Sequence, residues 1–86
     1  LLIYKKGGHF DEHSDTEKED GMFGTLVIQL PTTNGFKGGS FTAKHAGRTI
    51  TYDVDQYSKN HFYCNTFFSD VQHSLSKINS GYRLCL

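Results

Sequence analysis

The chain has 86 residues and nine acidic and nine basic side chains, so it carries no formal net charge at pH 7. This length allows one domain, and the balanced charge offers no bulk attraction for nucleic acid or a membrane surface. The sequence shows neither a long apolar run nor a signal-peptide pattern, so it leaves the compartment undetermined. Because the chain begins with Leu1 rather than Met, we expect residues 1–86 to be a single domain from a longer protein.

Short runs of β-branched and aromatic residues recur between turn residues, whereas helical periodicity is weak throughout. Glycine, asparagine and the single proline mark the connections, which include the segments "PTTNGFKGG" and "NSG". Strands of this length and spacing are typical of an all-β fold, either a sandwich or a barrel. The pattern predicts eight strands, at residues 1–6, 8–13, 23–30, 39–46, 48–54, 61–68, 71–78 and 82–86.

The first chemical signal lies in the acidic segment "HFDEHSDTEKED", residues 9–20, which taken alone is typical of a solvated loop. His13 and Asp15 are two residues apart in it, so both side chains point to one face of an extended strand. Two histidines and one carboxylate on one side of a metal, with the other positions open, form a non-haem Fe(II) site. A His-x-Asp pair is common by chance, so this hypothesis needs a distant histidine.

His73 is the best candidate, because Arg83 follows it ten residues later. An odd-length turn centred on Asn79 would fold the chain on either side into an antiparallel hairpin. His73 and Arg83 would then share a face, about 7 Å apart along the strands, whereas an even-length turn would separate them. The shared face would suit a small dicarboxylate, with one end on a metal and the other paired with the guanidinium.

The residues around these positions strengthen the pattern. They read "GGHFDEHSDTEKEDGMFGTLVIQLP", "GGSFTAKHAG", "SDVQHSL" and "SGYRLCL" in chain order. In this combination the chain resembles the iron(II)- and 2-oxoglutarate-dependent dioxygenases, specifically the prolyl 4-hydroxylase-like branch, over almost its whole length. The resemblance implies a double-stranded β-helix, or jelly roll, of about eight antiparallel strands. Members of this branch carry helices and further strands before the segment that opens this chain, and those are absent here.

Carried over by position, the resemblance implies that His13, Asp15 and His73 are Fe(II) ligands and that Arg83 binds the distal carboxylate of 2-oxoglutarate. Tyr4 matches a tyrosine that hydrogen-bonds this cosubstrate. The implied activity is hydroxylation of a substrate C–H bond with O2, giving succinate and CO2, with ascorbate as a candidate reductant. No catalytic side chain beyond the metal centre is implied. The substrate would be a prolyl or other protein side chain, or a small molecule.

Two other classes of protein stay open. One is a non-catalytic jelly-roll module that binds a metal or a partner. The presence of all four site side chains, His13, Asp15, His73 and Arg83, favours the oxygenase over such a module. The other is a cupin-type metal enzyme, for which a richer His/Glu cluster is typical, and the chain contains no His-x-His motif. No basic stripe with interleaved aromatic residues favours nucleic acid as a partner.

Four further residues have possible roles at or near the site. Thr25, Leu26 and Ile28 are candidates to line the pocket. Asp70 either orients His73 through a hydrogen bond or lies in the turn before it.

The remaining polar and sulfur-containing residues are assigned surface or structural roles. The segment 17–20 is either a solvated loop or a segment that covers the mouth of the site or contacts substrate. Cys64 and Cys85 are predicted to be two buried thiols, with a bridge between them left open. The histidines that lack the spacing of a metal site are His9, His45 and His61.

Overall fold

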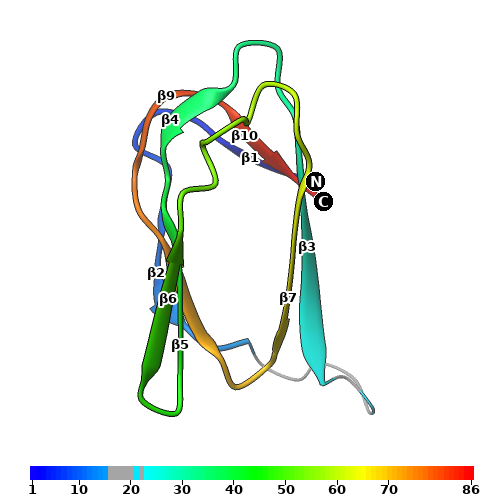
Figure 1. The fold of residues 1–86 in the computed structure, drawn as a ribbon, viewed down its shortest axis with the longest axis vertical. Helices are drawn as coiled ribbons and strands as arrows, with labels where there is room; N and C mark the ends of the chain where they lie inside the picture. The colour runs from blue at the N-terminus through cyan, green and yellow to red at the C-terminus, as the bar shows by residue number, and fades with distance from the viewer. Residues whose placement is uncertain (16–20, 22) are drawn as a thin grey trace.

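The computed structural model describes residues 1–15, 21 and 23–86 (Figure 1). This part of the chain forms ten β-strands and no helix, which confirms the all-β prediction, and no helix long and apolar enough to cross a membrane occurs in it. The strands are β1 (Leu2–Tyr4), β2 (Phe10–His13), β3 (Gly24–Leu30), β4 (Phe36–Gly38), β5 (Phe41–His45), β6 (Arg48–Tyr52), β7 (Tyr63–Phe68), β8 (Gln72–Leu75), β9 (Ile78–Gly81) and β10 (Arg83–Cys85).

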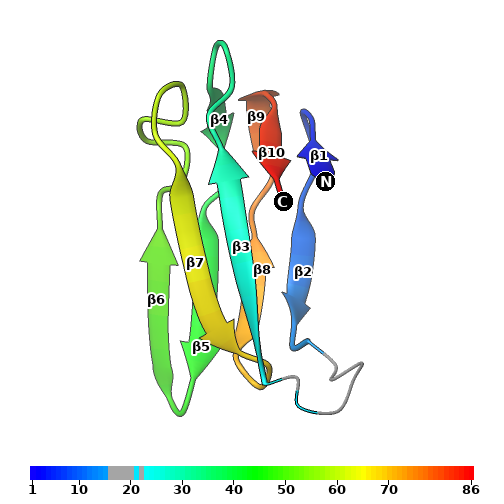
Figure 2. The same ribbon diagram turned by 90° about the vertical axis from the view of Figure 1, so that its right-hand side faces the viewer.

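Two four-stranded antiparallel sheets face each other, with the strand orders β1-β10-β3-β7 and β2-β8-β5-β6. Strands β4 and β9 form a separate two-stranded pair. Figure 1 shows β2, β5 and β6 on one side of the molecule and β3 and β7 on the other, and Figure 2 looks onto the β3–β7 side. The chain therefore crosses repeatedly between the sheets, and residues from distant parts of the sequence meet in the space between them.

The side chains that point between the sheets form the core. Exposure alternates along β7, where Tyr63, Asn65 and Phe67 are half-buried and the residues between them are exposed, as expected of a strand with one face inward. The buried cluster consists of Phe36, Phe41, Val54, Leu75 and Ile78, with Tyr4, Phe10, Ala43, Tyr63 and Phe67 packed against it.

Two of the ten strands were not predicted. β4 and β9 lie in segments whose glycines and asparagine predict turns, and the two strands pair with each other, with a register shift between Lys37 and Gly38. Gly38 and Gly81 both have positive φ, a conformation that glycine adopts at little cost. The glycines therefore mark the irregular ends of two short strands rather than plain turns.

The predicted hairpin around Asn79 is wrong. Asn79 lies within β9, which pairs with β4, so the chain crosses to the other sheet instead of turning back. As a result His73 on β8 and Arg83 on β10 belong to opposite sheets. Both side chains are nevertheless buried, at 5% and 2% exposure, and face the space between the sheets.

The outer face of the β1-β10-β3-β7 sheet is also apolar. Directly opposed residues share a face, so the register aligns Ile3, Leu84 and Leu30 across three strands and places Ile28 beside Cys64. Strand β3 thus carries its leucine and isoleucine side chains on the outer face, so its hydrophobic pattern alone does not indicate which face points inward.

The prediction of two buried thiols is correct for Cys85 and wrong for Cys64. Both cysteines are free, and Cys64 is exposed because it lies on the outward face of β7. Burial raises the pKa of the Cys85 thiol above its ordinary value, although the nearby Arg83 opposes this effect.

Candidate metal centre

The β2–β8 pair brings the two histidines together. His13, the last residue of β2, lies directly opposite His73 on β8, and their ring centroids are 4.4 Å apart. A register shift between Phe10 and His13 precedes this pairing. Because opposed residues share a face, both rings point into the space between the sheets.

Asp15 joins them from the chain that follows β2. Its backbone N–H donates to the carbonyl oxygen of Ser69, and the N–H of Ser69 donates to the carbonyl oxygen of Phe23, at 3.1 and 2.9 Å. The Oδ1 atom of Asp15 then lies 3.6 Å from Nε2 of His13 and 3.4 Å from Nε2 of His73. One ligand atom from each of the three residues lies within 4.8 Å of the others.

Hydrogen bonds at the far side of each ring determine which nitrogen is free. Nδ1 of His13 lies 2.8 Å from the carbonyl oxygen of Asp11, and Nδ1 of His73 lies 3.1 Å from that of Val71. A carbonyl oxygen can only accept, so each Nδ1 is the donor. In the neutral rings the lone pair is therefore on Nε2, the atom that faces Asp15, and this is how metal-binding histidines are oriented in proteins.

These residues fit a divalent transition metal. Two imidazole nitrogens and one carboxylate oxygen on one side, with open positions opposite, match the ligand preferences of Fe(II). Bonds of about 2 Å place neighbouring ligand atoms about 3 Å apart, so the observed separations of 3.4 and 3.6 Å need only small movements to close on an ion.

The two histidines differ in their surroundings. His73 is buried among aromatic rings, with the centroids of Phe67, Phe10 and Phe41 at 4.5, 5.7 and 6.0 Å. The His13 side chain is 49% exposed. The cluster therefore has an apolar wall on the His73 side and is open to solvent on the His13 side.

Arg83 lies on the inward face of the opposite sheet, and one edge of its guanidinium group is held by a hydrogen bond. Its Nε donates to Oε1 of Gln29 at 2.8 Å, and Nε2 of Gln29 donates to the carbonyl oxygen of Val54 at 2.9 Å. Burial lowers the pKa of the Arg83 guanidinium below its ordinary value. No acidic side chain in the described part of the chain forms an ion pair with it.

Tyr4 and Phe10 lie between the arginine and the histidines. Tyr4 is opposite Arg83 in the β1–β10 register, and the guanidinium carbon lies 5.3 Å from the centre of its ring. The Tyr4 ring is 6.3 Å from that of Phe10, which in turn contacts both His13 and His73. Burial raises the pKa of the Tyr4 hydroxyl, and the charge of Arg83 partly offsets this. Tyr4 thus lies beside Arg83, and its hydrogen bond to 2-oxoglutarate stays a prediction.

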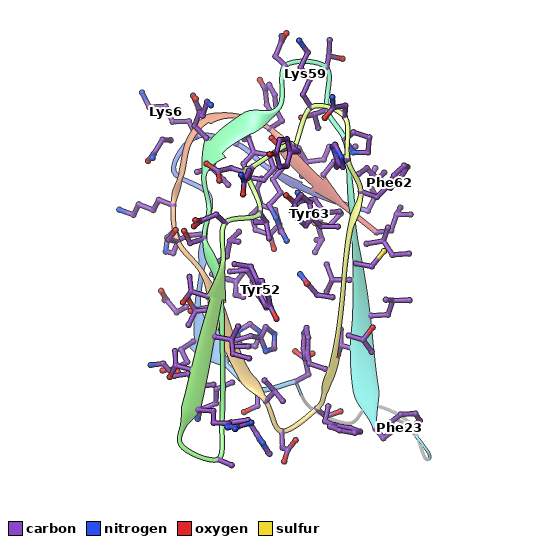
Figure 3. All side chains as sticks on the ribbon, in the orientation of Figure 1. Lys6, Phe23, Tyr52, Lys59, Phe62 and Tyr63 are labelled. Atoms are coloured by element: carbon purple, nitrogen blue, oxygen red, sulfur yellow. The ribbon has the colours of Figure 1, made fainter. Side chains whose placement is uncertain are left out.

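The structure separates the candidates for pocket lining. Thr25 is on the inner face of β3, where its hydroxyl donates to Oδ2 of Asp15 at 2.5 Å. Leu26 and Ile28 point to the outer face instead, so the prediction that they line the pocket is wrong. Figure 3 shows a further inward side chain, Tyr52, which projects between the sheets from β6.

Asp70 does not contact His73, so of its two predicted roles it has the one in the turn before β8. Its Oδ2 lies 3.1 Å from Nε2 of His45, and both side chains are exposed. His9 and His61 form local hydrogen bonds at the surface, and Nε2 of His9 also lies 3.7 Å from Oδ1 of Asp11. The predicted roles of the segment 17–20 lie outside the described residues.

Sequence reasoning missed Gln29. The available signal was a polar residue inside the apolar run "TLVIQL", because a buried amide requires hydrogen-bond partners. Gln29 is 1% exposed and finds both of its partners in the core.

Comparison with protein-family models, with curated proteins and with solved structures finds no match for this chain. The resemblance to the dioxygenases therefore rests on the residues of the chain alone.

Proposed function

We propose that the protein is an Fe(II)- and 2-oxoglutarate-dependent dioxygenase that hydroxylates a substrate C–H bond. The observation that carries this proposal is the pairing of two features in one inter-sheet space. One is a His-Asp-His cluster with free Nε2 atoms. The other is a buried arginine without an acidic partner among the described residues. A buried charge is costly unless it is paired, so Arg83 favours an anionic ligand.

We further propose that the fold is a double-stranded β-helix, or jelly roll. The strand orders β1-β10-β3-β7 and β2-β8-β5-β6 support it, because, apart from the β5–β6 hairpin, the successive strands of these two four-stranded antiparallel sheets alternate between them. In this view β4 and β9 are an added two-stranded extension at one end.

In the proposed mechanism His13, Asp15 and His73 hold the metal. When bound, Fe(II) supplies the oxidation of a substrate C–H bond by O2, coupled to conversion of 2-oxoglutarate into succinate and CO2. The Nδ1 hydrogen bonds of both histidines keep their Nε2 atoms directed inward. The protein thus contributes a preset ligand arrangement rather than an acid or base of its own.

Arg83 orients the cosubstrate. Gln29 holds its Nε, so the terminal nitrogens of the guanidinium remain to form a two-point contact with the distal carboxylate. Tyr4 packs on the guanidinium and borders the same position. The wall formed by Phe10, Phe41 and Phe67 limits water on the His73 side, which strengthens electrostatic interactions inside the site.

The substrate would approach from the exposed side of His13. A prolyl or other protein side chain and a small molecule are the candidate substrates, and the residue placement favours neither.

The test is anaerobic incubation of the chain with Fe(II) and 2-oxoglutarate, followed by O2 and measurement of succinate. We expect succinate to form slowly without substrate and to be lost in His13→Ala and Arg83→Ala. His45→Ala is the matched control, because His45 is exposed and lies away from the cluster beside Asp70. Metal binding without succinate, across a range of candidate peptides, would favour the non-catalytic metal-binding module. Absence of metal binding would overturn both readings.

A further inference from the structure

The two carboxylate oxygens of Asp15 have different surroundings. Oδ1 faces the Nε2 atoms of both histidines, at 3.6 and 3.4 Å. Oδ2 points away from them and accepts a hydrogen bond from the hydroxyl of Thr25 at 2.5 Å. The Asp15 side chain is only 22% exposed, so few water molecules can replace this donor. The carboxylate therefore offers one oxygen to a metal and the other to a protein hydroxyl.

The position of Thr25 allows it to hold Oδ2 of Asp15 away from the two histidines. It belongs to β3, whose sheet lies opposite the one that carries the two histidines. Its ladder partner on β7 is Phe67, whose ring packs 4.5 Å from that of His73. A β-branched side chain on a strand has restricted rotation about χ1. The hydroxyl is thus fixed by the sheet and reaches across to Asp15.

We propose that Thr25 is a positioning residue that keeps Asp15 a one-oxygen ligand and so preserves an open coordination position. This inference rests on the proposed function. Three protein ligands leave three positions on a six-coordinate ion, two for the chelating end of 2-oxoglutarate and one for O2. If Oδ2 also bound the metal, it would occupy one of these positions. The Thr25 hydroxyl opposes that, because Oδ2 would have to give up a hydrogen bond to a charged acceptor.

The test compares Thr25→Val, which removes the hydroxyl at nearly constant shape, with Thr25→Ser, which keeps it. Each protein is loaded anaerobically with Fe(II), and 2-oxoglutarate is titrated while the visible absorption of the iron chelate is followed. We expect the dissociation constant for 2-oxoglutarate to rise at least about tenfold in Thr25→Val and to return to within about threefold of the wild type in Thr25→Ser. Affinity for Fe(II) alone, measured by chelator competition, should not fall in Thr25→Val, because the freed oxygen becomes a ligand.

The outcomes separate this inference from the proposed function. Wild-type protein that binds neither Fe(II) nor 2-oxoglutarate would overturn the proposed function. Wild-type binding together with an unchanged 2-oxoglutarate constant in Thr25→Val would overturn only the role of Thr25. Should Thr25→Val fail to fold, X-ray absorption on the Fe(II)-loaded wild type decides the point. One oxygen from Asp15 supports the inference, and two oxygens overturn it.

Discussion

Arg83 places a positive charge in the interior, and its energetic balance depends on what lies beside it. Its Nε donates a hydrogen bond to Gln29, and its guanidinium group packs over the ring of Tyr4. No acidic side chain among the described residues forms an ion pair with it. Desolvation without a counter-charge is unfavourable. The ligand-free protein is therefore less stable than its packing alone would make it, and binding of a dicarboxylate should recover part of that loss.

Replacing Arg83 with methionine tests this balance. The change removes a buried charge, but it leaves Oε1 of Gln29 without its donor, which costs about 1–3 kcal/mol. Because the effects oppose each other, we expect the free energy of unfolding of the ligand-free protein to change by less than about 2 kcal/mol. Stabilisation by 2-oxoglutarate, seen as a rise in Tm of the metal-loaded wild type, should disappear. Arg48→Met on exposed β6 is the control, and a ligand-induced rise retained in Arg83→Met would contradict the proposed contact.

Cys85 makes stability depend on pH in the alkaline range. Its thiol is buried, and burial raises its pKa. A group whose pKa is higher in the folded state binds more protons there than in the unfolded chain once the pH exceeds its ordinary value, about 8.5 for cysteine. Its contribution is therefore fully present below that pH and is lost as the pH rises further.

We expect Cys85→Ala to reduce the alkaline loss of stability, measured as the free energy of unfolding between pH 7 and pH 10. Cys64→Ala, at an exposed position, is the matched control. In the native protein at pH 8, a thiol reagent should modify Cys64 promptly and Cys85 only after unfolding. Equal reaction rates of the two thiols would contradict the burial of Cys85.

Among the elements, β3 shows best what a sequence can and cannot reveal. The run "TLVIQL" predicts a strand, and a strand is present at Gly24–Leu30. The run does not reveal which face is inward, because the more apolar face, with Leu26, Ile28 and Leu30, points outward, and Thr25, Val27 and Gln29 point toward the partner sheet. The register with β7 is what distinguishes Thr25, on the inward face, from Leu26 and Ile28 on the outward face.

Local signals also limited the prediction of connectivity. His13, Asp15 and His73 could be proposed together because their spacing and flanking residues form a recognisable combination. The hairpin predicted between His73 and Arg83 was wrong because residues typical of turns, such as Asn79 and Gly81, also occur in short strands. Pairing between β4 and β9 depends on residues forty or more positions apart, such as Phe36 and Gly81, and local turn chemistry carries no information about it.

The two faces of β3 can be tested with a matched pair of substitutions. Val27→Asp places a charge on the inward face, opposite half-buried Asn65, and should lower the free energy of unfolding by about 2–4 kcal/mol. Leu26→Asp lies on the exposed outer face and should change it by no more than about 0.5 kcal/mol. Chemical denaturation measures both. A larger loss for Leu26→Asp than for Val27→Asp would show that the inward face is assigned incorrectly.

At the scale of the whole molecule, the candidate site belongs to both sheets. His13 and His73 come from one sheet, whereas Thr25 and Arg83 come from the other. The arrangement exists only when the sheets pack at their native separation. A metal that binds here therefore binds the folded state and not the unfolded chain, and it stabilises the fold by mass action.

Titration with Fe(II) under anaerobic conditions checks this coupling. At a free concentration one hundred times the dissociation constant, the free energy of unfolding should rise by about 2.7 kcal/mol. His13→Ala should lose most of this rise and still fold, because His13 is half-exposed, whereas His45→Ala should retain it. An equal rise in His13→Ala would place the metal elsewhere.

The backbone of Ser69 has a consequence for how the cluster is anchored. It accepts from Asp15 and donates to Phe23, so it fixes both ends of the segment between them. Ser69 lies four residues before His73, so the connection between β7 and β8 also holds Asp15 in place. A displacement of this connection would therefore move Asp15 and His73 together and preserve the distance between them.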